Sequence, residues 1–255
     1  MKTWFSFAIF AGLFAASCSA PQFAVEATYA RLEPSGNLAL TSSGNPVTRN
    51  SLHELGIEDE ESSVGLRADF EWGIPHVTLA TQSADWSGSG TETDFGGIAG
   101  ANVAVDSTMD VAVHRGLVTF DVLPVPMLEL GLGLGVAVID FEAEVQDQGN
   151  AFPAENIDEV LPVPVLVVRG GLDVWRLEFE AMVAGMSIDI DGNQAAYFDT
   201  EIVARLSLFD VGPVEAFLTA GYRRIDLDAE YEDGNEDVKA DFTLDGLFVG
   251  LRVSV

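Results

Sequence analysis

The sequence predicts an all-β protein that closes into an up-and-down antiparallel transmembrane β-barrel of about ten strands, with eight or twelve as alternatives. Three observations support this fold class. Apolar and polar residues alternate in segment after segment, as expected where successive strand side chains point to opposite sides. Short turns alternate with longer polar connections, which is typical of outer-membrane barrels. The chain also opens with a segment that has the form of an export signal.

The first twenty residues, MKTWFSFAIFAGLFAASCSA, place one lysine before the apolar run Trp4–Ala16 and end in small residues. The run is too short for a spanning helix but has the form of a secretory signal, a buried N-terminal helix being the alternative. AASC resembles a bacterial lipobox, so cleavage before Cys18 with acylation of Cys18 stands beside ordinary cleavage near Ala20. We expect a signal peptide over residues 1–20 and one outer-membrane barrel domain over residues 21–255.

The next alternating segments lie on either side of a long polar connection. In Phe23–Tyr29 the apolar residues at odd positions oppose Glu26, and in Ser63–Trp72 (SVGLRADFEW) the apolar residues at even positions oppose Arg67 and Asp69. Both segments are predicted to be strands with one apolar face. In the connection between them, Leu52, Leu55 and Ile57 offer an apolar patch that we expect to pack on the barrel.

The central stretch Met127–Val145 reads MLELGLGLGVAVIDFEAEV. Its leucines and valines fall on one face of an extended chain, and Gly131, Gly133 and Gly135 fall on the other. A helix would spread the leucines around its circumference and carry destabilising glycines, so the strand is favoured. We expect the leucines to face lipid and the glycines to relieve crowding in the lumen.

The same alternation continues in Leu177–Val183, Phe198–Leu208 and Val214–Tyr222. Short turns are predicted near Gly73–His76, Leu123–Pro126, Asp173–Trp175 and Asp210–Pro213. Longer loops are predicted over Glu33–Ser62, Ser87–Asp110, Glu144–Leu161, Asp191–Ala195 and Ala229–Val238. An even strand number then leaves both termini in the periplasm. Aromatic residues near the expected strand ends are predicted to form an interface belt, namely Trp72, Trp86, Trp175 and Tyr222.

The last strand, LFVGLRVSV (Leu247–Val255), alternates to the end of the chain. It resembles the C-terminal insertion signal of outer-membrane barrels, so the barrel assembly machinery is an expected partner. Phe242 and Leu244 are out of phase with Leu247, which predicts a β-bulge near Asp245–Gly246.

The stretch GYRRIDLDAEYEDGNEDVKADFTLDGLFVGLRVSV (Gly221–Val255), together with LGIEDEESSVGL (Leu55–Leu66) and the LPVP turns at Leu123–Pro126 and Leu161–Pro164, resembles a family of proteobacterial outer-membrane β-barrel proteins of unassigned function. The resemblance is specific in the GYRR and DGLFVGL segments. It implies the fold and an outer-membrane location, and it brings no catalytic residue. Family members usually end in phenylalanine, where this chain has Val255.

Composition excludes one class of partner. The chain has 12 Lys+Arg against 41 Asp+Glu, a net charge of −29, and nucleic-acid binding needs a basic surface. Expected partners are outer-membrane lipid and lipopolysaccharide, with divalent cations bridging the acidic loops to lipid phosphates. A soluble β-sandwich or lipocalin-like barrel, with the apolar face inward, is the competing fold.

The predicted inward faces carry many charged side chains. Fully paired, they would fill the barrel and leave a structural or surface-interaction role; loosely paired, their excess of carboxylates would make a small cation-preferring pore for ions or small solutes. Ten strands leave little bore, which favours the filled form. The predicted lumen charge network consists of Glu26, Arg67, Asp69, Glu71, Glu129, Glu178, Glu180, Asp199, Glu201, Arg205, Glu215, Arg223 and Arg252.

An outer-membrane hydrolase is a third and weaker interpretation. It would need a histidine beside a carboxylate at the rim, which His114 with Asp110 or His53 with Glu54 could supply. Carboxylates are so abundant that such neighbours arise by chance, so we expect no enzyme activity. No cofactor and no metal site is predicted.

Overall fold

A computed structural model describes the chain except for residues 1–20, 43–47, 124, 126, 191–192 and 234–235. The predicted signal peptide and Cys18 therefore lie outside the described residues. The described residues contain no helix long and apolar enough to cross a membrane.

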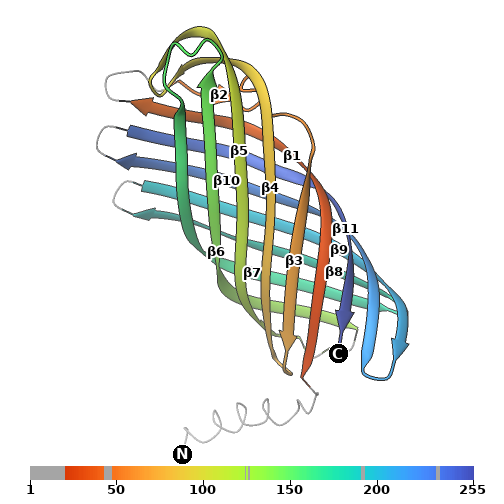
Figure 1. Cartoon of the computed structure of the whole chain (residues 1–255). Coiled ribbons are helices and arrows are strands. Elements are labelled where there is room, and N and C mark those ends of the chain that lie inside the picture. Colours follow the sequence, from red (N-terminus) through yellow and green to blue (C-terminus); the bar gives the residue numbers. More distant parts are fainter. Residues whose placement is uncertain (1–20, 43–47, 124, 126, 191–192, 234–235) are drawn as a thin grey trace, which may run out of the picture.

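Ten long antiparallel strands and one two-residue strand form a single sheet in which the long strands pair in chain order and the two-residue strand β2 pairs with β1. The sheet closes because β11 also pairs with β1, with Ala24 opposite Ser254 and Ser42 opposite Glu236. The predicted closed up-and-down barrel is confirmed (Figure 1). The strands are β1 (Gln22–Ser42), β2 (Asn50–Ser51), β3 (Glu61–Glu71), β4 (Pro75–Phe95), β5 (Ile98–Asp121), β6 (Leu128–Asp147), β7 (Glu155–Val174), β8 (Leu177–Ile190), β9 (Asn193–Val211), β10 (Val214–Asp233) and β11 (Glu236–Ser254).

The two ends of the barrel differ. The start of β1 and the end of β11 meet at what we call the lower end, together with the short turns after β3, β5, β7 and β9 (Figure 1). At the opposite, upper end the strands run further than expected. Most of the predicted loops Ser87–Asp110, Glu144–Leu161 and Ala229–Val238 belong to strands, and β4 and β5 are separated only by residues 96–97. Loops were predicted for these strand halves because their outward faces are polar.

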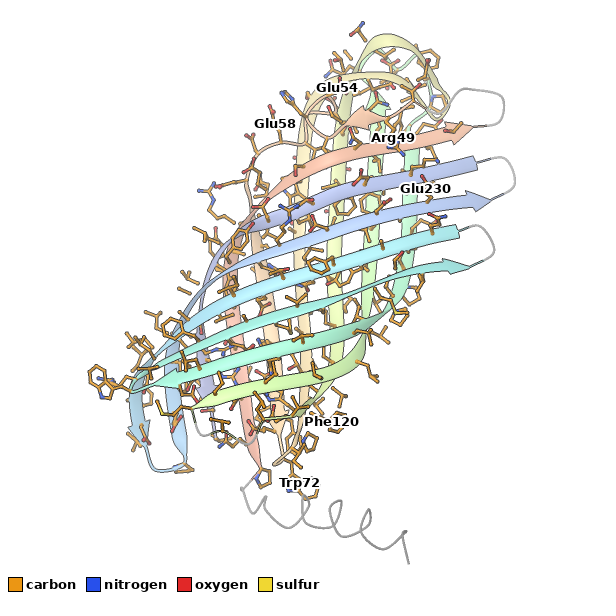
Figure 2. The ribbon with its side chains drawn as sticks, turned by 180° about the vertical axis from the view of Figure 1, so that it is seen from behind. Arg49, Glu54, Glu58, Trp72, Phe120 and Glu230 are labelled. Carbon is orange, nitrogen blue, oxygen red and sulfur yellow. The ribbon has the colours of Figure 1, made fainter. Side chains whose placement is uncertain are left out.

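An apolar belt covers the outer surface of the lower half. The leucines of β6 point outward, Leu132 being 47% and Leu134 63% exposed, and the alternating glycines point inward, as predicted. Trp72 and Phe120 lie at the lower end, whereas Glu54 and Glu58 lie at the upper end (Figure 2). An exposed apolar band of this kind is what a lipid-facing barrel surface requires.

The two faces exchange character halfway up the strands. Along β6, Ile139, Phe141 and Val145 are buried inside, while Glu142 and Glu144 are exposed outside. The upper half of the barrel is thus filled by an apolar core, here called the upper core, and has a polar exterior. The lower half has the opposite arrangement, so each long strand carries two patterns in succession.

This exchange of faces overturns two expectations. Phe242 and Leu244 are out of phase with Leu247 because they belong to the upper core, and the pairing of β11 runs past Asp245 and Gly246 without a bulge. Trp86 is buried in the upper core rather than placed in an interface belt.

The connection between β2 and β3 folds back onto the barrel. β3 begins lower than its neighbours, so the upper part of β4 has no partner from it beyond the pair Val64–Ser83. The connection covers this part of β4 with Leu52, Leu55 and Ile57, which are all buried in the upper core. The prediction that this apolar patch packs on the barrel is confirmed.

Candidate functional site

Ten charged side chains meet inside the lower half of the barrel. They come from the inward faces of seven strands, and five are arginines and five are carboxylates, so the cluster is electrically neutral. Nine of them were predicted from the sequence, and one, Arg115, was not. We call this set the ion-pair network; its members are Glu26, Arg67, Asp69, Arg115, Glu180, Asp199, Glu201, Arg205, Arg223 and Arg252.

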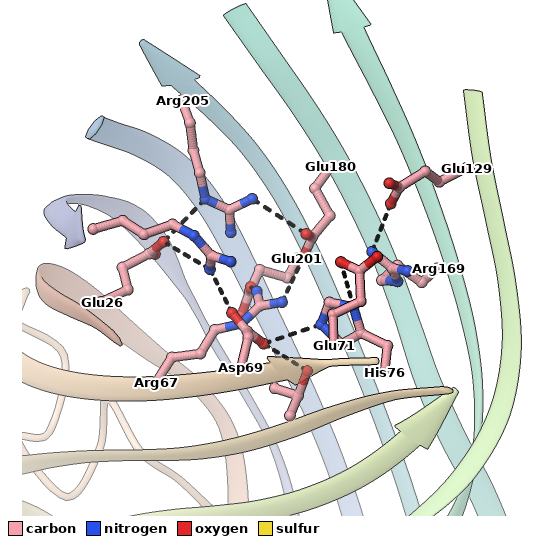
Figure 3. A network of polar contacts seen from close by, with 12 residues as sticks. Glu26, Arg67, Asp69, Glu71, His76, Glu129, Arg169, Glu180, Glu201 and Arg205 are labelled. Atoms are coloured by element: carbon pink, nitrogen blue, oxygen red, sulfur yellow. Dashed lines mark hydrogen bonds and ion pairs between the residues drawn. The ribbon is translucent and has the colours of Figure 1, made fainter. Parts of the chain in front are cut away.

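Six members of the network form a closed ring of alternating charge (Figure 3). The Arg67 guanidinium donates to Asp69 at 3.0 Å and lies 2.8 Å from Glu180. Each charge in the ring therefore has two neighbours of opposite sign. In order around it, the residues are Arg67, Glu180, Arg205, Glu26, Arg252 and Asp69.

Arg205 and Arg252 complete this ring on the opposite side from Arg67. Arg205 donates to Glu26 at 3.0 Å and to Glu180 at 3.2 Å. Arg252 lies 3.8 Å from Glu26 and donates to Asp69. Asp69 is held further by Thr78, whose hydroxyl donates to it at 2.7 Å.

The other members form a second, smaller cycle above the first. Arg115 donates to Asp199 at 2.7 Å and to Glu201 at 3.0 Å, and Arg223 donates to Asp199 at 2.9 Å and lies 3.9 Å from Glu201. The Tyr197 hydroxyl donates to Asp199 at 2.8 Å. Glu201 also accepts from Arg67 at 3.1 Å, which joins the two cycles.

Strand register explains why these residues meet. Glu26 on β1 stands opposite Arg67 on β3 and opposite Arg252 on β11. Glu201 on β9 stands opposite Arg223 on β10. Facing positions of neighbouring strands lie about 5 Å apart, so the ladder itself places opposite charges in contact.

Burial makes the pairing of these charges mandatory. Asp199 is fully buried, and Glu26 and Arg205 are nearly so. A charge removed from water loses several kcal/mol of solvation, which only close partners of opposite sign can offset. The neutral, cyclic arrangement gives every ion such partners. It also differs from expectation, because the carboxylate excess predicted for the lumen as a whole is absent from the network.

That excess lies lower, in a water-accessible vestibule. A polar cavity of about 150 Å³ opens there, and the remaining predicted lumen residues line it: Glu71, Glu129, Glu178 and Glu215. Arg169, which was not predicted from the sequence, donates to Glu129 at 2.9 Å (Figure 3). It also donates to Asp121 at 2.9 Å. His76 lies 3.4 Å from Asp69 and so links the vestibule to the network.

Little space remains within the network itself. The cavity beside Arg67, Arg115, Glu201 and Arg223 measures about 30 Å³. One water needs roughly 10–15 Å³ on this measure, so the cavity holds one or two waters and no larger solute.

The two arginines that sequence reasoning missed, Arg115 and Arg169, do carry a signal. Arg115 follows Val111 and Val113 at the same two-residue spacing and shares their inward face. This run begins where a loop was predicted to end. Arg169 follows Val165 and Val167 on β7 in the same way.

Neither predicted histidine–carboxylate pair forms. His53 contacts Glu58 at 3.0 Å instead of Glu54. His114 and Asp110 are four residues apart on one extended strand, too far to touch, and His114 contacts the Thr81 hydroxyl at 2.8 Å. Across the described residues there is no group of three or more side chains able to hold a metal ion.

No family model matches the chain, and no curated protein matches it. Among solved structures, the outer membrane protease OmpT from Escherichia coli is similar with a TM-score of 0.54 and 7% identity, over 91% of this chain and 97% of that chain. A FadL homologue of Pseudomonas aeruginosa (TM-score 0.35, 10% identity, 92% and 90%) and Neisserial surface protein A (TM-score 0.32, 14% identity, 92% and 99%) also match.

At these identities the likeness shows the fold alone. The fold is the closed antiparallel barrel of bacterial outer-membrane proteins, a class whose members here include a protease. The resemblance to a proteobacterial family of unassigned function stays a prediction.

Proposed function

We propose that the protein is an outer-membrane barrel with a closed lumen and a structural or surface-interaction role. The observation that supports this best is the neutral ion-pair network that fills the lower half of the barrel. A solute passing through would have to separate buried arginines and carboxylates in a space that holds only one or two waters to replace their partners. Breaking one buried pair costs about 3–5 kcal/mol. The upper core adds a second, apolar obstruction above the network.

A cation-preferring pore is the second candidate, and the vestibule is the observation that favours it. Its carboxylates outnumber its arginines, so small cations would gather at the lower end. The path ends at the network, however, where the free space shrinks from about 150 Å³ to about 30 Å³. Attraction at the entrance without a passage gives no conduction.

The outer surface of the upper half suggests where the surface role lies. Exposed carboxylates surround the barrel above the apolar belt, forming what we call the acidic collar. It would meet the phosphates of outer-membrane lipid and lipopolysaccharide, with divalent cations between the two sets of anions. The assembly machinery would recognise Leu247–Val255 on β11. The collar comprises Asp85, Asp106, Asp110, Asp140, Glu142, Glu144, Asp158, Asp228 and Asp241.

Single-channel recording in planar bilayers tests the closed lumen. We expect the wild-type protein to insert without conductance steps. The triple variant Glu178→Gln, Glu180→Gln, Glu201→Gln should lower the melting temperature by at least about 5 °C, because Arg67 and Arg205 lose partners.

A matched control neutralises three exposed collar residues, Asp140→Asn, Glu142→Gln and Glu144→Gln, and should leave the melting temperature within about 2 °C. Steady cation-selective conductance of the wild type, weakened in the network variant, would establish the pore instead.

A further inference from the structure

The wall of the barrel is interrupted between β7 and β8. These strands pair only from Val174–Leu177 up to Leu166–Gly185. Above that point residues 155–165 of β7 continue to pair with β6 but have no partner on β8. Figure 1 shows the upper half of β7 rising steeply while β8 runs off to one side. The upper wall therefore has a lateral opening.

The sequence of β7 suits a free edge. Pro162 and Pro164 are two residues apart, so their nitrogens face the same side of the strand. The ladder with β6 passes through both residues, opposite Val138 and Val136. A proline nitrogen has no hydrogen to donate, and in a strand it is tolerated on an unpaired side. Residues 162 and 164 therefore have no backbone N–H group that would lack a hydrogen-bond acceptor at an opening toward lipid.

The barrel wall has a second interruption, between the upper parts of β1 and β4, and another segment of the chain fills it. There the β2–β3 connection inserts Leu52, Leu55 and Ile57, and its Glu54 carbonyl accepts a hydrogen bond from the Thr91 N–H of β4 at 2.7 Å. The described residues include no comparable segment across the gap between β7 and β8. A cavity lies there instead.

This cavity measures about 270 Å³ and is almost entirely apolar. It extends from Phe141 and Ile157 on one wall to Ile188 and Leu227 on the other. The small side chains of Ala195, Ala229 and Ala240 belong to its lining and leave space that larger residues would occupy. The volume is nearly twice that of an apolar protein cavity of about 150 Å³ that binds benzene.

The cavity communicates with the outer surface. Pro162 lines it although it lies on the outward face of β7. The outer surface beside the opening is apolar, with Val160 57% and Leu166 65% exposed and Phe198 half exposed on β9. The mouth thus sits at the upper edge of the apolar belt, where a lipid-facing surface ends.

We propose that this opening admits the hydrocarbon chain of a single-chain membrane amphiphile with an uncharged head group. The chain would enter sideways from the lipid phase, because the mouth is continuous with the apolar belt. The cavity volume of about 270 Å³ suits one chain of about ten carbons or fewer. The net charge of −29 of the chain disfavours an anionic head group.

Photolabelling tests this site in the intact protein. The probe is 1-decanol carrying a terminal diazirine, incorporated in phosphatidylcholine vesicles with the protein. We expect labelling of the outer belt and of the inward residues Phe141 and Leu227. The pocket-filling variant Ala195→Leu, Ala240→Phe should reduce interior labelling at least tenfold and leave belt labelling unchanged. The outward-facing variant Ala220→Phe should behave as wild type.

Competition supplies a test that needs no variant. Excess unlabelled 1-decanol should suppress interior labelling at least fivefold, and the same concentration of decanoate should not. Belt labelling without interior labelling in the wild type, or equal suppression by decanoate, would overturn the proposal. The site is independent of ion conduction: a conducting wild type would refute the closed lumen and leave this binding result standing.

Discussion

At the scale of single residues, Glu92 has an unusual position. It lies on the inward side of β4, above the apolar belt, and is 1% exposed. Burial disfavours the ionised form, and the nearby Asp94 and Asp147 add repulsion, so the pKa of Glu92 is raised to about 7 from the usual 4.5. Its carboxyl group is therefore half protonated near neutral pH.

This raised pKa predicts a pH-dependent stability. The folded state holds the proton more tightly than the unfolded state, so stability is greatest below pH 4.5 for this group and falls as the pH rises toward and past 7. The loss is about 3 kcal/mol. Glu92→Gln should remove it, so the variant should melt higher than wild type at pH 8 and the difference should shrink steadily as the pH falls to 5. Parallel melting curves across pH 5–8 would contradict the assignment.

The alternating leucines and glycines show that sequence can predict the face on which a residue lies but not every reason for its identity. The alternation assigned Leu132 to the outside and Gly133 to the inside, because strand periodicity alone decides this. The reason for Gly133 was not accessible from the sequence. A Cβ atom there would collide with the backbone carbonyl of Val118 on β5, whereas at Gly131 it would meet only side chains in ordinary contact. Backbone proximity depends on sheet curvature, which no single segment encodes.

At the scale of the elements, the long strands pass through two environments. A single alternation of apolar and polar residues predicts only the lower half of each strand, so many upper halves were expected to be loops. The change of phase was visible in IDFEAEVQD of β6, where acidic residues alternate with Ile139, Phe141, Ala143 and Val145. Reading that change requires knowing that one strand can leave the lipid and continue as the wall of a water-exposed barrel.

The outward acidic faces of these strand extensions predict a dependence on divalent cations. In vesicles that contain lipopolysaccharide, chelation should lower the melting temperature, because carboxylates and lipid phosphates then repel each other directly. In phosphatidylcholine vesicles chelation should have no effect. The variant Asp140→Asn, Glu142→Gln, Glu144→Gln should show a smaller effect of chelation than wild type. Equal melting temperatures with and without chelator in lipopolysaccharide would refute the bridging role.

At the scale of the whole molecule, the barrel has two halves, built on one continuous sheet, whose inner and outer faces have opposite character. The lower half is apolar outside and closed by the ion-pair network; the upper half is acidic outside and closed by the upper core. Nine network residues were predictable because they alternate with lipid-facing residues on clear strands. Their neutral pairing was not, because it required Arg115 and the register of the seven strands that carry the network.

Cysteine accessibility along β6 in intact cells tests this arrangement most directly. Single substitutions would be compared with a parent that has only Cys18, using a membrane-impermeant maleimide. We expect rapid labelling of Glu142→Cys and Glu144→Cys, protection of Leu132→Cys and Leu134→Cys by lipid, and protection of Ala143→Cys in the upper core. Labelling of the leucine positions with protection of the glutamate positions, or equal labelling of both, would contradict the exchange of faces.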